Sequence, residues 1–342
     1  MFSTKKRTYK QHYNEKDSFY KYSSPKFTEL EELSENLNTD ICIVGGGLTG
    51  ISAALNLADQ GYDVCILEAN QIGSGASGRN GGQLGIGMRK DQLYLENKFG
   101  FEKAEFFWNI GLDSVKNVTN LISKYNIDCA LKPGILHAGN TKKDYKYFLE
   151  EIEHMKSKYN YDNYEYFDEN AIKDEVNTDQ YYSGLLTKDS FHLNPLKLTY
   201  GLANQCLGKG IKIFENSPID KIEEKGNDIL LFSKNAVIKS KKVIIACNGY
   251  LDNLLGSVSN FFMPINNYII ATEPLGEKLA RQIIKRNCGV VDSRFMIDYY
   301  RFSEDHRLLF GGPETLTSKF VNNPVEFVSK RLFRVFPDLK NY

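Results

Sequence analysis

The sequence of 342 residues predicts an α/β fold that is α+β in part. A glycine-rich turn at residues 45–50 separates a short apolar run from a helical pattern, which is typical of a strand-turn-helix unit in a parallel sheet. A second apolar run, at residues 243–246, again leads into a glycine turn, and the alternating pattern after residue 258 indicates a mixed or antiparallel sheet. Because single hydrophobic cores stop growing at about 250 to 300 residues, we expect two interleaved domains.

The first predicted unit has the glycine spacing of a nucleotide-binding turn. Residues 41–44 are expected to form a buried strand, and Gly45, Gly47 and Gly50 follow it directly. In such a turn the first glycine permits the tight bend, the second lets the backbone approach a pyrophosphate, and the third lets the helix pack on the strand. The helix predicted over residues 51–60 would direct its N-terminal amides toward a phosphate.

An acidic residue completes this unit. A second strand is predicted over residues 63–67 and ends at Glu68, at the position where a carboxylate accepts hydrogen bonds from both hydroxyls of an adenosine ribose. This carboxylate favours FAD or NAD over NADP. Glycine turns alone are common and the alternative is an ordinary βα turn, but the flanking strands, the helix and the glutamate together make the signal specific.

A second glycine-rich segment follows at residues 73–87, GSGASGRNGGQLGIG, without a helical or strand period. Backbone of this kind, so close to a nucleotide-binding turn, is expected to lie along a flat ligand. Arg79, Asn80 and Gln83 place donors among the glycines, which argues against a flexible linker.

Hydrophobic spacing and turn residues predict the remaining elements. Helical segments are expected over residues 91–125, 142–159, 194–210 and 324–336. Strands are expected over residues 135–138, 211–214, 219–222, 229–232, 236–238, 243–246, 268–272, 296–302 and 308–312, with a hairpin tip at Asp305 and His306.

The expected division has three parts. They are an N-terminal arm at residues 1–36, a dinucleotide-binding domain at residues 37–95 and 190–257, and a second domain at residues 96–189 and 258–342.

Composition disfavours several classes of protein. The chain has 43 basic and 43 acidic residues, so no general field would attract nucleic acid or an anionic membrane. The six cysteines occur singly, without CxxC pairs or matching histidines, which fits a reduced, cytoplasmic setting without a metal site. No window has the length and apolarity of a signal-peptide core or a membrane span. Oligomeric state has no signature in the sequence.

Several motifs resemble the D-amino-acid-oxidase superfamily of FAD enzymes, most closely its gamma-glutamylputrescine oxidoreductase branch. The resemblance runs from about residue 18 to the end of the chain, and GASGRNGGQ is fairly specific to this branch and its near relatives. Besides the glycine turn, the matching segments are IGSGASGRNGGQ at 72–83, YNIDCALKPGIL at 125–136, FHLNPLKLTYGLA at 191–203, VIIACNGYL at 243–251, DYYRFSEDHRLLFGG at 298–312 and FPDLK at 336–340.

This resemblance implies a Rossmann-like βαβ domain that binds FAD noncovalently, interleaved with a substrate domain built on a mixed antiparallel sheet. It also implies three groups of FAD-contacting positions. Gly45, Gly47 and Gly50 would meet the pyrophosphate and Glu68 the ribose, Ser77, Gly78, Arg79, Asn80, Gly81, Gly82 and Gln83 would run beside the flavin, and Ile219 and Gly249 would close over the adenine side.

The implied reaction is oxidation of a small-molecule primary amine. Gamma-glutamylputrescine would lose a hydride equivalent from the carbon that bears its terminal amine, and the imine would hydrolyse to an aldehyde and ammonia while oxygen becomes hydrogen peroxide. Because the flavin carries the electron chemistry, no strong side-chain acid or base is compulsory, which agrees with the absence of a clear catalytic triad or carboxylate pair.

Candidate substrate-site residues lie in two of these segments. Tyr299, Tyr300 and Arg301 are expected to help line the substrate pocket, where Arg301 would offer a bidentate guanidinium to the glutamyl carboxylate. The alternative is sheet packing for Tyr300 and a surface ion pair for Arg301. His192 is a further candidate, although a hydrogen-bonded structural histidine at a strand end is the favoured interpretation.

Other functions remain open at this point. The same fold would suit a secondary-amine or amino-acid oxidase or dehydrogenase of the sarcosine or glycine type, or a non-catalytic flavin-binding protein. Flavin-dependent tRNA modification is disfavoured by the balanced charge.

The resemblance also implies a C-terminal segment, with a glycine- and histidine-containing stretch that returns to the flavin and a final helix, which this sequence does not show. We expect the 342-residue form to bind FAD more weakly, or to turn over more slowly, than an extended form.

Overall fold

The computed structural model describes residues 18–251, 254–316 and 320–341, so residues 1–17 of the predicted N-terminal arm lie outside the described residues. The chain divides into two compact units, each discontinuous in sequence. Of the described residues, unit 1 contains those within Met1–Arg79 and Pro195–Ile265, and unit 2 contains those within Asn80–Asn194 and Asn266–Tyr342.

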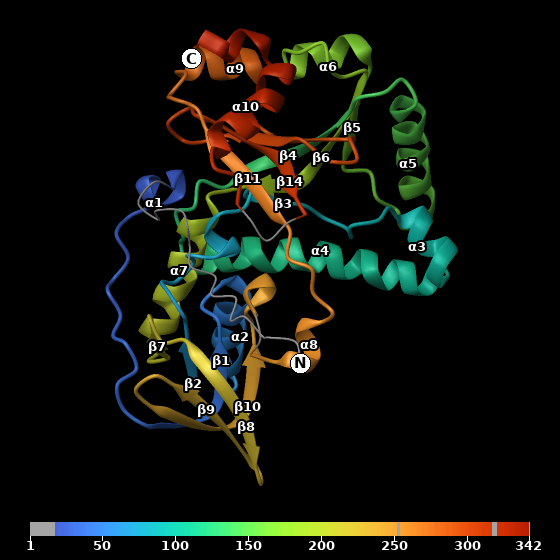
Figure 1. Ribbon diagram of the computed structural model, residues 1–342. Helices are drawn as coiled ribbons and strands as arrows, with labels where there is room; N and C mark the ends of the chain where they lie inside the picture. Colours follow the sequence, from blue (N-terminus) through green and yellow to red (C-terminus); the bar gives the residue numbers. More distant parts are fainter. Residues whose placement is uncertain (1–17, 252–253, 317–319, 342) are drawn as a thin grey trace, which may run out of the picture. The chain divides into compact units, whose positions relative to one another are not determined.

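Unit 1 is built on a six-stranded sheet. Its strand order is β7-β2-β1-β10-β9-β8, in which β7, β2, β1 and β10 run parallel and β9 and β8 are antiparallel additions. Figure 1 shows its early strands in blue beside its later strands in yellow, although these come from distant parts of the chain. The strands are β1 (Leu37–Val44), β2 (Val64–Leu67), β7 (Lys212–Phe214), β8 (Ile219–Lys225), β9 (Asp228–Ser233) and β10 (Val237–Ile245).

Strand β10 corrects one prediction, because the two strands expected at residues 236–238 and 243–246 form a single one. It pairs with β9 from Val237 to Ser240 and with β1 as far as Ile245. Exposed lysines at positions 239, 241 and 242 interrupt the apolar pattern, while the buried Ser240 hydroxyl accepts a hydrogen bond from the Cys42 amide at 3.0 Å.

Helices α2 (Leu48–Asp59) and α7 (Pro195–Gly208) pack together in unit 1. The Cys206 thiol on α7 lies 3.7 Å from the carbonyl oxygen of Ile51 on α2. Helix α1 (Phe19–Ser23), from the N-terminal arm, also contacts α7. The short elements η2 (Ala76–Gly78), η3 (Asn248–Tyr250) and α8 (Gly256–Ser259) complete this unit.

Unit 2 contains an eight-stranded sheet of mixed direction. Its path is β11-β14-β13-β12-β4-β6-β3, and β5 also pairs with β6. Among the described strands of this sheet, β12 and β4 form the one parallel pair. The strands are β3 (Gln83–Leu84), β4 (Lys132–Gly139), β5 (Tyr164–Phe167), β6 (Ser183–His192), β11 (Asn266–Ala271), β12 (Gly289–Asp292), β13 (Tyr299–Phe302) and β14 (Leu308–Thr315).

The helices of unit 2 cover its hydrophobic core. Residues of α9 and α10 join the core side chains of β12, β13 and β14 in one buried cluster. The segment predicted as one helix over residues 91–125 is two helices, because Gly100 has a φ of 83° and accommodates the break. The helices are α3 (Gln92–Phe99), α4 (Phe101–Lys124), α5 (Asp144–Tyr159), α6 (Glu169–Glu175), α9 (Glu277–Ile283) and α10 (Pro324–Val335), followed by η4 (Pro337–Asn341).

Most predicted elements are present with shifted ends, and the hairpin tip at Asp305 and His306 lies between β13 and β14 as expected. The helices and strands that were not predicted are α1, β3, β5, α6, most of β6, α8, α9 and β12. These elements are short or lack a clear hydrophobic period. Contacts with neighbouring strands and helices, rather than a local pattern, stabilise them. The α/β class with a mixed sheet is confirmed.

The boundaries of the two units, after Arg79, Asn194 and Ile265, differ from the predicted ones after residues 95, 189 and 257. Strand β3 belongs with unit 2 because it pairs with β6 there. None of the described helices is both long and apolar enough to cross a bilayer.

Candidate functional site

The glycine turn after β1 has no room for side chains. A Cβ atom added to Gly50 would lie 2.0 Å from the Gly45 carbonyl oxygen, and one on Gly45, whose φ is 116°, would lie 2.6 Å from the Ala246 oxygen. A Cβ on Gly47 would lie 2.7 Å from the Ser77 hydroxyl. The backbone itself therefore forms the surface at the start of α2, where helix amides favour an anion.

Glu68 stands at the end of β2, and its carboxylate faces this turn. Oε2 accepts a hydrogen bond from the Gly46 amide at 2.7 Å, and Oε1 accepts one from the Asn70 amide at 2.8 Å. These two amides orient the carboxylate beside the glycine turn, as a ribose-binding glutamate requires.

The loop after Glu68 is held by a buried glutamate that the sequence analysis did not identify. The Glu215 carboxylate, 5% exposed, accepts a hydrogen bond from the Ile72 amide at 2.7 Å. Burial raises its pKa, and the hydrogen bond from Ile72 opposes this shift. Only its position, directly after the short strand β7, distinguishes Glu215 in the sequence, which is a weak signal.

The second glycine-rich segment begins in unit 1, where η2 lies against the first turn. The Ser77 hydroxyl accepts a hydrogen bond from the Leu48 amide at 3.0 Å, so it contacts the first residue of α2. A Cβ on Gly78 would lie 2.2 Å from the Gly73 oxygen. Arg79 is half-buried and ends the part of the segment that belongs to unit 1.

The segment continues in unit 2 as a short ribbon, Asn80 to Gln83, that leads into β3. The Asn80 side-chain oxygen accepts a hydrogen bond from the Gly82 amide at 2.8 Å. Gly82 has a φ of 69°, and a Cβ there would lie 2.1 Å from the Leu193 oxygen. The Gln83 side-chain amide donates to the Val290 carbonyl at 2.9 Å. The Asn80 oxygen and the Gln83 amide thus fix the shape of the ribbon itself.

Tyr300 and Arg301 lie on opposite faces of β13. Tyr300 is 1% exposed in the core, stacks on Phe310 at 5.4 Å, and its hydroxyl lies 3.0 Å from that of Tyr181. Burial raises its pKa well above the ordinary value. These contacts favour the packing alternative for Tyr300 over a place in a substrate pocket.

Arg301 is 3% exposed, so it does not form the surface ion pair that was the alternative interpretation. Its Nε donates to the Gly81 carbonyl at 2.8 Å and its Nη1 to the Phe302 carbonyl at 3.3 Å. The guanidinium is therefore directed at the backbone of the ribbon and of its own strand.

His192 ends β6 opposite Gln83, and it is also buried, at 1% exposure. Its Nε2 lies 2.6 Å from the Asn287 carbonyl oxygen, which only accepts, so Nε2 carries the proton. In the described part of the chain Nδ1 has no hydrogen-bond partner. This arrangement fits the structural interpretation of His192.

The family model described as FAD dependent oxidoreductase, DAO, matches residues 40–342. The chain belongs to the DAO family. Within it, this chain is 36% identical to gamma-glutamylputrescine oxidoreductase of Escherichia coli (strain K12), over 94% of this chain and 76% of the relative. Probable oxidoreductase OrdL of Haemophilus influenzae (strain ATCC 51907 / DSM 11121 / KW20 / Rd) is 34% identical over 95% of this chain and 75% of its own length.

Solved structures support the fold of this DAO family member. Glycine oxidase from Bacillus cereus ATCC 14579 has a TM-score of 0.67 and 18% identity, covering 89% of this chain and 79% of that structure. L-proline dehydrogenase from P. horikoshii has a TM-score of 0.66 and 21% identity, covering 90% of this chain and 79% of that structure.

The cofactor of this DAO family chain is FAD, and unit 1 fits the adenosine half of that cofactor. The turn at Gly45, Gly47 and Gly50 leaves bare backbone where a pyrophosphate would lie, and Glu68 lies beside it. Ile219 begins edge strand β8, and Gly249 lies in η3, where an added Cβ would meet nothing closer than 4.0 Å. Their place at the adenine side remains a prediction.

His192 yields a testable pH dependence in this DAO family member. Burial, together with the charges of Arg301 and Lys132, lowers the pKa of His192 to about 4, whereas the Asn287 carbonyl opposes the shift. Between pH 6.5 and pH 4 the unfolded chain binds the additional proton, so the free energy of unfolding falls as the pH falls through this range. We expect the free energy of unfolding to fall by about 2 kcal/mol between pH 7 and pH 5 because of His192.

Urea unfolding of the wild type and of His192→Gln at both pH values measures this contribution. The variant keeps a donor for the Asn287 carbonyl but has no titratable ring. A variant with the same acid sensitivity as the wild type would contradict the assignment of His192 as a buried neutral imidazole.

Proposed function

We propose that this chain oxidises the primary amine of gamma-glutamylputrescine or a closely similar polyamine conjugate. The overall reaction consumes one amine, one oxygen molecule and one water molecule, and it yields an aldehyde, ammonia and hydrogen peroxide. Two electrons and two protons leave the amine and its carbon, and they reduce oxygen to the peroxide.

The observation that carries this proposal is the extent of the similarity to the named amine oxidoreductase, over 94% of this chain. Similarity over a short stretch would not support it. The mitochondrial glycerol-3-phosphate dehydrogenase of Saccharomyces cerevisiae (strain ATCC 204508 / S288c) is 30% identical over 105 residues, only 30% of this chain. A cofactor-binding fold is shared by enzymes with different substrates, so substrate class depends on the rest of the chain.

Different segments of this chain would hold different parts of the cofactor. When bound, FAD supplies two-electron chemistry that amino-acid side chains lack. Gly45, Gly47 and Gly50 would hold its pyrophosphate through backbone amides, and Glu68 would accept hydrogen bonds from the ribose hydroxyls. The ribbon from Asn80 to Gln83 would provide a preformed surface beside the flavin ring.

Anaerobic mixing of purified, flavin-loaded protein with gamma-glutamylputrescine tests the substrate class. We expect the visible flavin absorbance to be lost, and to return with formation of aldehyde and hydrogen peroxide when air is admitted. Putrescine, which lacks the glutamyl carboxylate, serves as the matched control substrate and should react more slowly. Loss of absorbance with glycine, sarcosine or proline, but not with gamma-glutamylputrescine, would replace the proposal with an amino-acid or secondary-amine oxidase.

Flavin that remains oxidised with every amine would instead support a non-catalytic flavin-binding protein. The same experiment therefore separates the three functions that the sequence left open. Preference for oxygen over another acceptor is measured by the rate at which absorbance returns in air.

A further inference from the structure

We propose that Arg301 and Tyr299 are positioning residues for the flavin-flanking ribbon at Asn80 to Gln83, and that Arg301 serves this ribbon rather than the carboxylate of a substrate. The inference rests on the proposed placement of the ribbon beside the flavin. It assigns a role to the face of β13 that is turned away from the hydrophobic core.

The first observation is the direction of the Arg301 side chain. Its Nε donates to the Gly81 carbonyl at 2.8 Å, and a Cβ added to Gly82 would lie only 2.9 Å from Nη2 and 3.0 Å from Nε. The guanidinium therefore lies against the ribbon backbone, where any side chain at Gly82 would displace it. A hydrogen bond from a charged donor is stronger than one between neutral groups.

The second observation is the packing of Tyr299, two residues earlier on the same face of β13. A Cβ on Gly81 would lie 2.8 Å from its ring, and a Cβ on Gly311 would lie 2.5 Å from the ring. The ring is thus packed between two glycines, one in the ribbon and one in β14. Its hydroxyl donates to the side-chain oxygen of Asn267 on β11, which orients the ring.

The third observation is that the ribbon contacts both strands of one hairpin. Gln83 donates to the Val290 carbonyl on β12, and Arg301 on β13 holds Gly81. Strands β12 and β13 pair with each other, with Val290 opposite Tyr300. The ribbon is therefore fixed to a paired unit rather than to a single side chain.

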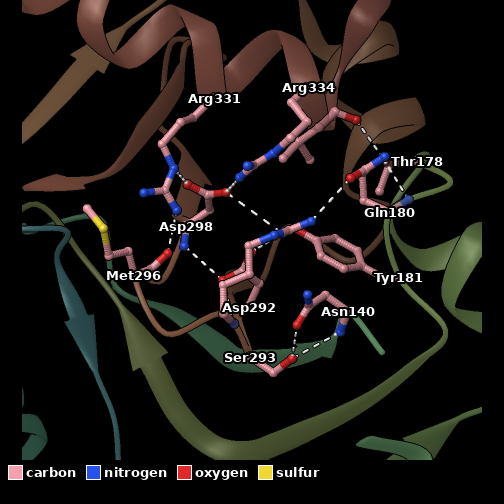
Figure 2. Close-up of polar contacts among 12 residues, drawn as sticks. Asn140, Thr178, Gln180, Tyr181, Asp292, Ser293, Met296, Asp298, Arg331 and Arg334 are labelled. Carbon is pink, nitrogen blue, oxygen red and sulfur yellow. Dashed lines mark hydrogen bonds and ion pairs between the residues drawn. The ribbon is translucent and has the colours of Figure 1, made fainter. Parts of the chain in front are cut away.

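A buried ionic cluster closes the far end of this hairpin (Figure 2). The Asp298 amide donates to Asp292 Oδ1 at 2.8 Å, and the Asp292 amide donates to the Asp298 carbonyl at 2.9 Å. Arg331 and Arg334 of α10 lie 2.6 and 2.7 Å from the Asp298 carboxylate, and Arg294 pairs with Asp292. This cluster, the Asp298 cluster, fixes β13 one residue before Tyr299.

These contacts explain why a buried arginine is present beside a glycine ribbon. Glycines at 81 and 82 leave the middle of the ribbon, between Asn80 and Gln83, without side chains, and Gly82 has a positive φ. Arg301 and Tyr299 supply the missing contacts from a strand that the Asp298 cluster fixes in place. The ribbon is thereby preorganised for a flat ligand.

The test compares Arg301→Ala, Arg301→Lys and a control in the core on the neighbouring strand β14, Phe310→Leu. The dissociation constant for FAD and the visible absorption and circular dichroism of the bound flavin are measured without any substrate. We expect Arg301→Ala to raise the dissociation constant for FAD about tenfold, because one charge-assisted hydrogen bond to the ribbon is lost. The spectrum of the bound flavin should also change. Arg301→Lys should recover part of this loss, because one ammonium donor can reach Gly81 but cannot span both carbonyls.

Phe310→Leu should lower thermal stability while leaving the flavin spectrum and FAD affinity at the wild-type values, because Phe310 lies in the core cluster. Wild-type FAD affinity and spectrum in Arg301→Ala would overturn the inference. If that variant also showed a higher KM only for amines that carry a carboxylate, Arg301 would be a substrate-binding residue. If Arg301→Ala fails to fold, Arg301→Lys and Tyr299→Leu replace it in the test. Wild-type FAD affinity and flavin spectrum in both of these variants would also overturn the inference.

Because these measurements need no substrate, their outcome is independent of the proposed amine oxidation. Loss of flavin absorbance with another substrate class would change the proposed function and leave the role of Arg301 standing.

Discussion

Replacing Gly50 by alanine should remove FAD binding from an otherwise folded chain. The added Cβ would lie 2.0 Å from the Gly45 carbonyl oxygen and 3.1 Å from the Ile43 side chain, so α2 must move away from β1. Overpacking of this kind costs about 1 to 3 kcal/mol, and the helix amides that face the pyrophosphate move with the helix. We expect the dissociation constant for FAD to rise at least about 100-fold, which corresponds to roughly 2.8 kcal/mol.

Gly208→Ala is the matched control for this experiment. Gly208 ends α7 in the same unit, and an added Cβ there meets nothing within 4 Å. Flavin content after gel filtration with excess FAD, and fluorescence quenching titrations, compare the two variants. If the Gly50→Ala variant retains the wild-type affinity for FAD, the glycine turn does not bind the pyrophosphate.

Replacing Asp298 by alanine should destabilise unit 2 by about 3 to 5 kcal/mol. The Asp298 carboxylate has no exposed surface and lies within 2.7 Å of both Arg331 and Arg334. Its removal leaves two arginines, one of them largely buried, without this partner, and the desolvation of that charge is no longer offset. Trp108, the only tryptophan, is buried in unit 2, so its fluorescence in the apoprotein reports the unfolding of that unit.

Asp162→Ala provides the control, because its ion pair with Lys156 is exposed on both sides and such pairs contribute about 1 kcal/mol or less. Urea midpoints of the two variants and the wild type should separate clearly. If Asp298→Ala lowers the free energy of unfolding no more than Asp162→Ala does, the Asp298 cluster does not fix the β12 and β13 hairpin. The FAD dissociation constant of Asp298→Ala should also rise, since the strand that carries Arg301 begins at the next residue.

Much of the nucleotide-binding part could be predicted because its determinants are local. The glycines at 45, 47 and 50 and the carboxylate at 68 lie within one βαβ segment, where residue spacing determines geometry. Where the substrate-side candidates lie could not be predicted, for the opposite reason. Tyr300 and Arg301 are neighbours in sequence, yet alternation along β13 sends Tyr300 into the core and Arg301 to the ribbon.

Local patterns were sufficient to predict the mixed α/β class and the glycine turn with its glutamate, and the resemblance of several motifs predicted the family with its FAD cofactor. The contacts of Arg301 and Glu215, by contrast, follow from the three-dimensional fold. Arg301 meets Gly81 across 220 positions of sequence, and Glu215 meets Ile72 across 143. Turn and helix signals arise from steric preferences of adjacent residues, whereas these contacts depend on strand order and pairing, which local patterns do not encode.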